Sequence, residues 1–203
     1  MAVLIRLAAA EDAAAIAAIY RPYVEQSRIS FEEEAPDAAE MARRMDSPIH
    51  PWLLAEEEGR ILGYASSSPY HRRPAYRWTV ETSIYLAADA QGRGVGRELL
   101  SSLVELLARQ GYVTAIAAIA LPNPISIALH ERLGFAPTGT YRGVGFKLGQ
   151  WTDVSLWQRD LAPRRAMTEA PLPFAQVRHP GLQQGSAFSP TAGRRGDPGS
   201  GPG

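Results

Sequence analysis

Three glycines at every second position form the segment whose chemistry is easiest to anticipate. Residues 91–96 read Gln-Gly-Arg-Gly-Val-Gly and lie between a segment with strand alternation and one with helical periodicity. Without side chains, consecutive backbone N–H groups can converge on one point and approach an anion closely. The helix that follows adds the positive end of its dipole. The turn therefore predicts a site for a phosphate or pyrophosphate.

Known phosphate-binding patterns narrow the choice of ligand. A P-loop needs Gly-Lys-Ser/Thr, which this turn lacks, and a dinucleotide fingerprint needs Gly-x-Gly-x-x-Gly in the first βαβ unit. Here the third glycine comes one residue early, and the turn falls in the middle of the chain. A tight turn that merely needs small residues is the alternative reading.

A second block, residues 123–135, begins with Asn and ends with Gly-Phe. Together with the glycine turn it resembles the two sequence blocks of the Gcn5-related N-acetyltransferase (GNAT) superfamily. There the first block binds the pyrophosphate of coenzyme A through backbone amides, and the Asn of the second lies near the pantetheine arm. The resemblance implies acetyl-CoA as co-substrate, no metal, and a single α/β domain with a mixed central sheet flanked by helices.

Further segments give a closer resemblance, to the phosphinothricin N-acetyltransferases. They are Trp52–Glu56, Ala75–Glu81, Leu129–Phe135, Trp151–Val154 and Trp157–Asp160, and the likeness covers roughly residues 2–161. Members of that family acetylate phosphinothricin, a glutamate analogue whose side chain ends in a methylphosphinate. The resemblance implies acetyl transfer to the α-amino group of phosphinothricin or a similar amino-acid analogue. Methionine sulfoximine, methionine sulfone or a general L-amino acid is the alternative acceptor.

Glu81 is the candidate general base. An ammonium has no lone pair and an α-amine has a pKa of about 8, so a base assists the reaction at neutral pH. Alternation along residues 78–86 places Glu81 on one strand face with Ser83 and Tyr85. A solvated glutamate on an outer face is the alternative. Because the chain has no cysteine to carry the acetyl group, we expect direct attack by the amine in a ternary complex.

The resemblance also assigns residues to the coenzyme. Amides of one strand, bulged in the superfamily, contact the thioester; here they belong to Ile84, Tyr85 and Leu86. The pyrophosphate is expected against Gly92, Arg93, Gly94, Val95, Gly96 and Arg97. The two arginines also offer charge, unless they are merely solvated. Asn123 hydrogen-bonds the pantetheine, caps the helix that begins at Pro124, or does both.

His130 stands where many superfamily members carry a tyrosine that protonates the departing thiolate. A histidine titrates near neutrality, so it can donate a proton or orient a water molecule. A packed helix histidine with a hydrogen-bonded ring is the equally weighted alternative.

An amino-acid acceptor carries negative charge that cations must meet. The resemblance places Arg73 and Tyr76 in the acceptor site, with Phe31 as an apolar wall. Further candidates to pair with the charge of the acceptor are Arg72, Arg77 and Lys147, though a single arginine is often only a surface residue. The aromatic and arginine-rich segment 70–78 favours a closed anionic pocket over the open groove of a protein acetyltransferase.

Composition excludes several other classes. Lys plus Arg and Asp plus Glu each total 21, so no basic excess points to nucleic acid. The absence of cysteine removes disulfides, cysteine-ligated zinc and a thiol nucleophile. No apolar run has the length of a membrane span, and the first residues do not resemble a secretion signal. We therefore expect a cytoplasmic protein without membrane or nucleic-acid partners.

Alternating strand and helix patterns define one folded unit, residues 1–161. Strands are expected at 3–7, 52–56, 61–67, 78–86, 112–119, 141–146 and 153–160. Helices are expected from about Glu11 through Val24, at 38–45, from the glycine turn to Gly111, and at 124–133. Proline and glycine make up a third of residues 162–203, which predicts a disordered tail.

Two other functions compete with small-molecule acetylation. Acetylation of a protein N-terminus or lysine is one, and a non-catalytic acyl-CoA-binding module, which needs no Glu81, is the other. The family resemblance also implies a homodimer. Trp151 and Trp157 contribute either to its interface or to the core.

Overall fold

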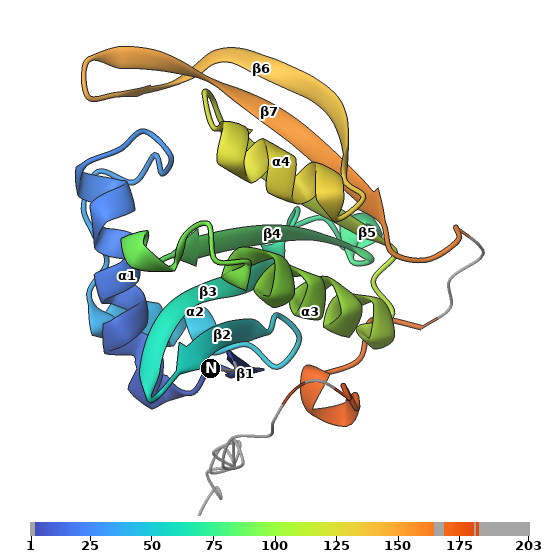
Figure 1. The fold of residues 1–203 in the computed structure, drawn as a ribbon. Coiled ribbons are helices and arrows are strands. Elements are labelled where there is room, and N and C mark those ends of the chain that lie inside the picture. Colours follow the sequence, from blue (N-terminus) through green and yellow to red (C-terminus); the bar gives the residue numbers. More distant parts are fainter. Residues whose placement is uncertain (1–2, 165–168, 181, 183–203) are drawn as a thin grey trace, which may run out of the picture.

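The computed structural model describes residues 3–164, 169–180 and 182. Within that range a seven-stranded sheet has the order β1-β2-β3-β4-β5-β7-β6 (Figure 1). All neighbouring strands are antiparallel except β4 and β5, which are parallel. The expected α/β fold with a mixed central sheet is confirmed.

The elements follow one another along the chain as expected. The strands are Leu4–Leu7 (β1), Trp52–Glu57 (β2), Arg60–Pro69 (β3), Thr79–Leu86 (β4), Thr114–Ala120 (β5), Ala136–Lys147 (β6) and Gln150–Asp160 (β7). The helices are Ala13–Glu25 (α1), Ala38–Met45 (α2), Val95–Gln110 (α3) and Pro124–Arg132 (α4). Short 3₁₀ turns lie at Ala10–Asp12, Pro74–Tyr76, Ala88–Ala90 and Phe174–Gln176.

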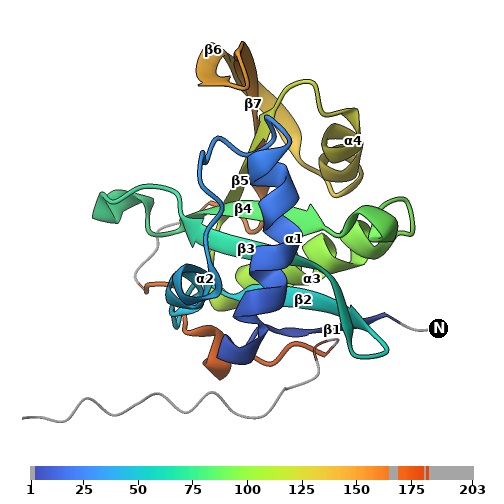
Figure 2. The ribbon, with the colours of Figure 1, turned by 90° about the vertical axis from the view of Figure 1, so that its left-hand side faces the viewer.

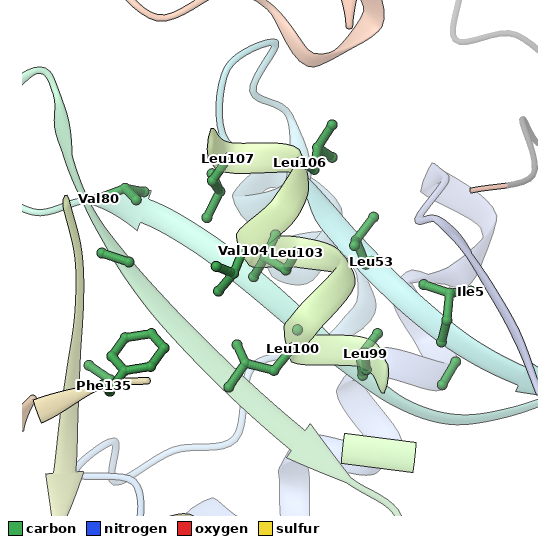
Figure 3. Close-up of a cluster of buried hydrophobic side chains, with 14 of the residues drawn as sticks. Ile5, Leu53, Val80, Leu99, Leu100, Leu103, Val104, Leu106, Leu107 and Phe135 are labelled. Atoms are coloured by element: carbon green, nitrogen blue, oxygen red, sulfur yellow. The ribbon is translucent and has the colours of Figure 1, made fainter. Parts of the chain in front are cut away.

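Helices cover both faces of the sheet (Figures 1 and 2). On one face, α1 and α2 pack over Leu54 and Tyr64. On the other face, α3 contributes six fully or almost fully buried side chains: Leu99, Leu100, Leu103, Val104, Leu106 and Leu107 (Figure 3). Side chains of α4 pack against this second core. The periodic leucines of α3 therefore hold the glycine turn at its N-terminus against the sheet.

The last two strands are longer than the sequence predicts. They form a hairpin that turns at Leu148-Gly149, and β6 starts at Ala136 rather than near Tyr141. The first nine residues of β6 are exposed. Since alternation marks a strand only when one face is buried, this part of β6 leaves no periodic signal.

The C-terminal stretch corrects the expectation of a disordered tail for the residues that the structure describes. Leu172 exchanges backbone and side-chain hydrogen bonds with Gln110 at the end of α3, both at 2.7 Å. The Phe174 N–H donates to the Pro48 carbonyl, and the Phe174 and Val177 side chains pack on the core. Apolar side chains spaced between the prolines supply enough contact to order this segment. Residues 183–203 lie outside the described range.

No helix in the described residues is long and apolar enough to cross a membrane.

Candidate active site

Strands β4 and β5 part in the middle of the sheet. They pair only from Thr79 to Glu81, opposite Thr114 to Ile116. Just beyond, the Thr82 hydroxyl donates to the Ile116 carbonyl at 3.2 Å. The remaining residues of both strands diverge, so backbone groups of β4 lose their partners on that side. An opening between two parallel strands is thereby built into the sheet.

The thioester-contacting strand was expected to be bulged. Its pairing with β3 is regular, however, from Val80 opposite Pro69 to Leu86 opposite Gly63. Successive N–H groups of a strand point to opposite sides, and the Ala87 N–H donates to the Leu62 carbonyl, so in the regular register the Tyr85 N–H also points to β3. The departure of β5, not a register shift against β3, therefore frees the amides of Ile84 and Leu86. The expected bulge and the expected role of the Tyr85 amide are corrected.

The glycine turn connects the end of β4 to α3. Gly92 and Gly94 have φ of 74° and 84°, a left-handed conformation that glycine adopts at little cost. The N–H groups of Arg97 and Glu98 both donate to the Gly94 carbonyl. The N–H groups of Val95 and Gly96, two residues earlier, have no acceptor among the described residues, as is usual at a helix start. The N–H groups of Val95 and Gly96 are therefore free to donate at the same place where the positive end of the α3 dipole lies.

Gly96 fixes how closely α3 approaches the rest of the site. A Cβ at this position would lie 3.2 Å from Leu86 Cδ1, 3.6 Å from Leu129 Cδ2 and 3.7 Å from Ile84 Cδ1. These contacts bring α3, α4 and the end of β4 to one point. The third glycine of the turn is explained by this packing.

Tyr23 on α1 ties the turn to β4, a contact that sequence reasoning missed. Its hydroxyl donates to the Leu86 carbonyl at 2.6 Å and accepts from Gln91 Nε2 at 3.1 Å. The helical periodicity of α1 marks Tyr23 as apolar, and nothing in the spacing signals a partner 63 residues away.

The two arginines of the turn, Arg93 and Arg97, differ in whether their charge is already paired with a carboxylate. One guanidinium nitrogen of Arg93 donates to both carboxylate oxygens of Glu57, at 2.7 and 2.9 Å. Arg97 is exposed and has no ion-pair partner among the described residues. The charge of Arg93 is thus already compensated, and Arg97 is the arginine available to a phosphate.

Glu81 is half-buried at the last position where β4 pairs with β5. Its carboxylate makes no hydrogen bond or ion pair to any described residue. Burial raises its pKa above the ordinary value for glutamate. A carboxylate with a raised pKa and unused acceptor oxygens is suited to take a proton from an amine.

Tyr85 lies four residues after Glu81 on the same face of β4 and belongs to an aromatic cluster. Its ring lies 4.7 Å from Tyr20, 5.1 Å from Tyr23 and 5.5 Å from Tyr64. Burial raises the pKa of its hydroxyl. The cluster packs α1 against β4 beside the candidate base.

Asn123 caps α4: its Oδ1 accepts from the Ser126 N–H at 3.1 Å. The capping alternative is confirmed. The cap uses only the carbonyl oxygen, which leaves the amide donors of Asn123 for another partner.

His130 is 3% exposed, and its ring lies edge-on to Phe135 at 5.0 Å. Nδ1 is 2.8 Å from the Ser126 carbonyl oxygen, which can only accept, so Nδ1 carries a proton. Burial lowers the pKa of the ring despite this hydrogen bond. In the neutral form Nε2 is therefore an acceptor. The packed alternative accounts for all of these contacts.

Phe31 follows α1 and lies directly against β6. Its ring is so close to Gly145 that a Cβ there would come within 2.4 Å of two ring carbons. Lys147, expected among the substrate cations, is 8% exposed and donates to the carbonyls of Val24 and Ser30. It fastens the loop after α1 to β6, so its expected availability to a substrate is wrong.

The segment expected to close an anionic pocket is open in this chain. Residues 70–77 are all exposed, and Tyr76 is 40% exposed. Tyr76 contacts Tyr70 and His71 edge-on or tilted, and the Arg73 N–H donates to His71 Nδ1. Arg73 and Tyr76 thus share one exposed loop, while the Phe31 ring packs against Gly145 of β6.

Known proteins match nearly the whole folded chain. Residues 5–156 match the acetyltransferase (GNAT) domain. A phosphinothricin N-acetyltransferase from Streptomyces viridochromogenes is 39% identical over 86% of this chain and 92% of its own. A solved phosphinothricin acetyltransferase from Sinorhizobium meliloti, in complex with acetyl-CoA, is 41% identical with a TM-score of 0.76, covering 79% and 89% of the two chains. The chain belongs to the phosphinothricin N-acetyltransferase family of the GNAT superfamily.

A second group of relatives carries another substrate in its name. An L-methionine sulfoximine/L-methionine sulfone acetyltransferase from Pseudomonas aeruginosa is 36% identical over 82% of this chain and 99% of its own. Both groups are named as acetyltransferases. This GNAT-family chain is accordingly an acetyl-CoA-dependent N-acetyltransferase.

The acetyl-CoA co-substrate fits the site of this GNAT enzyme. A Cβ at Gly92 or Gly94 would meet nothing within 4 Å, so open space lies outside the turn where a pyrophosphate would sit. The N–H groups of Val95 and Gly96 and the side chain of Arg97 face that space or flank it. Within the described residues no group of three or more His, Asp or Glu side chains could hold a metal ion.

Proposed function

We propose that this enzyme transfers the acetyl group of acetyl-CoA to the α-amino group of phosphinothricin or a similar amino-acid analogue. Three relatives named for phosphinothricin are 39–41% identical to the chain. The observation that carries the catalytic assignment is Glu81, a half-buried carboxylate with no partner among the described residues at the point where β4 and β5 part.

In this mechanism Glu81 accepts a proton from the acceptor ammonium. The free amine attacks the thioester carbonyl carbon, a C–N bond forms, and the C–S bond breaks when the tetrahedral intermediate collapses. The backbone N–H groups of Ile84 and Leu86 stabilise the oxyanion, because they are fixed donors before the reaction begins. The turn at 92–97 and Asn123 hold the coenzyme, so the two reactants meet in one complex.

His130 takes part through Nε2 as an acceptor. A neutral ring whose Nδ1 donates to Ser126 can orient a water molecule or the pantetheine arm, whereas donation to the thiolate would first require protonation of Nε2. The thiolate then takes its proton from solvent, and the proton that the attacking nitrogen loses when the intermediate collapses is released to solvent.

Phe31, Arg73 and Tyr76 form the acceptor site in this proposal. Since Arg73 and Tyr76 lie on an exposed loop, the pocket they line is completed by another surface, and a second copy of the chain in a homodimer would supply it. Trp151 at 67% exposure, in contact with Phe146, offers an apolar patch for that association, while Trp157 at 4% belongs to the core. We place the catalytic domain at residues 1–161 and the enzyme in the cytoplasm.

A substrate panel tests the function. The protein would be incubated with acetyl-CoA, a thiol reagent and, separately, phosphinothricin, methionine sulfone, methionine sulfoximine, glutamate and an N-terminal peptide. We expect the highest kcat/KM for phosphinothricin. Preference for methionine sulfone or sulfoximine would select the alternative acceptor, and release of CoA with none of the amines would refute the proposal.

A further inference from the structure

The tip of the hairpin formed by β2 and β3 flanks the glycine turn. Glu57 and Arg60 face each other at the ends of these two strands, whereas β4 ends opposite Gly63, so the tip extends beyond the end of β4. The Ala87 N–H, just after β4, donates to the Leu62 carbonyl at 2.8 Å. The chain that leaves β4 for the turn therefore passes beside the charged residues of this tip.

Two ion pairs join the hairpin tip to the segment between β4 and α3. Arg60 Nη2 lies 2.7 Å from the Asp89 carboxylate. Arg93 Nη2 donates to the two carboxylate oxygens of Glu57, at 2.7 and 2.9 Å. The pairs have opposite directions, because the tip supplies the cation to Asp89 and the anion to Arg93. Only the second pair engages a positive charge that belongs to the glycine turn.

Arg93 stands between Gly92 and Gly94, where the phosphates of the coenzyme are expected. Its side chain is 41% exposed, and among the described residues only its Nη2 is engaged. A guanidinium carries five donor hydrogens, and an ion pair at the surface is held weakly. Phosphate oxygens accept strong charge-assisted hydrogen bonds from arginine. A phosphate at the turn can therefore draw the Arg93 guanidinium away from its carboxylate.

Glu57 opposes this exchange. The Arg93 guanidinium holds the pKa of the Glu57 carboxyl below its ordinary value, so the carboxylate is charged throughout the neutral range. Once Arg93 bonds to a phosphate, the Glu57 carboxylate has lost that partner and lies near a second anion. Binding of the coenzyme thus includes the cost of breaking an existing ion pair.

We propose that Glu57 competes with the coenzyme phosphates for Arg93 and thereby weakens the binding of acetyl-CoA and CoA alike. This inference rests on the proposed placement of the phosphates at the glycine turn, and it adds a residue outside that turn. The product CoA carries the same phosphates as acetyl-CoA, so the competition also helps the product to leave. Glu57 acts only through Arg93 and is a positioning residue.

The test measures coenzyme binding by calorimetry without an acceptor. Glu57→Gln keeps the length of the side chain and removes its charge, so the Kd values of acetyl-CoA and CoA should both fall about three- to tenfold. The gain should vanish in 1 M salt, where the Debye length is about 3 Å. The Kd of S-acetylpantetheine, which has the acyl arm but no phosphate, should not change.

Two further variants separate the release of Arg93 from a general effect of charge. Asp89→Asn is the matched control, because it removes one negative charge beside the same turn but releases Arg60 instead of Arg93. Its Kd for acetyl-CoA should stay within about twofold of the wild-type value. Adding Arg93→Gln to Glu57→Gln should abolish the gain, since no guanidinium is then left to release.

An unchanged or higher Kd for acetyl-CoA in Glu57→Gln would overturn the inference, because Glu57 would then only brace the turn. An equal gain in Asp89→Asn, or a gain that persists without Arg93, would also overturn it. If the wild-type enzyme binds acetyl-CoA no more tightly than S-acetylpantetheine, the placement of the phosphates fails and the inference fails with it. No acceptor takes part in these measurements, so their result is independent of the substrate panel.

Discussion

Gly145 and Phe31 form the contact whose energetics can be worked out most directly. A Cβ on Gly145 would lie 2.4 Å from two carbons of the Phe31 ring and 2.8 Å from a third. Carbon atoms in favourable contact are about 3.5–4.0 Å apart, so Gly145→Ala creates an overlap of more than about 1 Å. Gly145 does not have a positive φ, and thus the ring is the main obstacle to alanine.

The cost of Gly145→Ala follows from how the ring can respond. Phe31 is 41% exposed, so it can rotate toward solvent and give up the part of its surface that is now covered. Full burial of a phenylalanine is worth about 1.5–3 kcal/mol, and overpacking costs about 1–3 kcal/mol. We expect Gly145→Ala to lower the free energy of unfolding by about 1–2 kcal/mol.

A double-mutant cycle measured by urea unfolding checks this value. In a Phe31→Ala background the obstacle is gone, and Gly145→Ala should be neutral or stabilise by up to about 0.5–1 kcal/mol through the unfolded state. A coupling energy above about 1 kcal/mol is therefore expected. Equal costs of Gly145→Ala in both backgrounds would refute the reasoning. Both single variants should also raise KM for the acceptor and leave that for acetyl-CoA unchanged.

Three further predictions concern the base, the C-terminal segment and the exposed hairpin. Glu81→Gln should lower kcat by about 10²- to 10⁴-fold and leave the Kd of acetyl-CoA unchanged; near-normal turnover at saturating substrate would place the base elsewhere. Because burial raises the Glu81 pKa and only the carboxylate accepts a proton, activity should fall with decreasing pH at a higher pH than for an exposed glutamate, as a kcat/KM profile would show. Gln110→Ala removes hydrogen bonds to Leu172 and Ile49 and should destabilise by about 1–3 kcal/mol in urea, whereas an unchanged midpoint would mean that the C-terminal segment adds no stability. Trp151→Glu should shift the dimer that we propose toward monomer in sedimentation velocity, and an unaltered distribution would locate the interface elsewhere.

The sequence pattern was sufficient to predict those helices and strands that have a buried face and a clear boundary. Residues 38–45 form the predicted helix, and the glycine turn begins α3 as expected. The exposed part of β6 and the C-terminal segment were missed, because neither has the periodicity of a buried element. Asn123 was correctly anticipated as a cap, since capping depends only on residues three apart.

Contacts between distant segments were beyond such reasoning. Lys147 was grouped with substrate cations by its charge, but its burial and its bonds to two carbonyls depend on how β6 crosses the end of α1. Charge and residue type predict what a side chain can do, whereas the tertiary fold decides whether it is free to do so.

Tyr23 gives the enzyme a route for thermodynamic linkage between its two reactants. Its hydroxyl bridges the end of β4 and the glycine turn, while its carbonyl accepts from Ser27 in the loop that carries Phe31. A co-substrate that steadies the turn would also steady this loop. The acceptor should therefore bind more tightly to the acetyl-CoA complex than to the free enzyme. By reciprocity the acceptor tightens acetyl-CoA by the same factor, so the ternary complex forms at lower concentrations of both reactants than independent binding would allow.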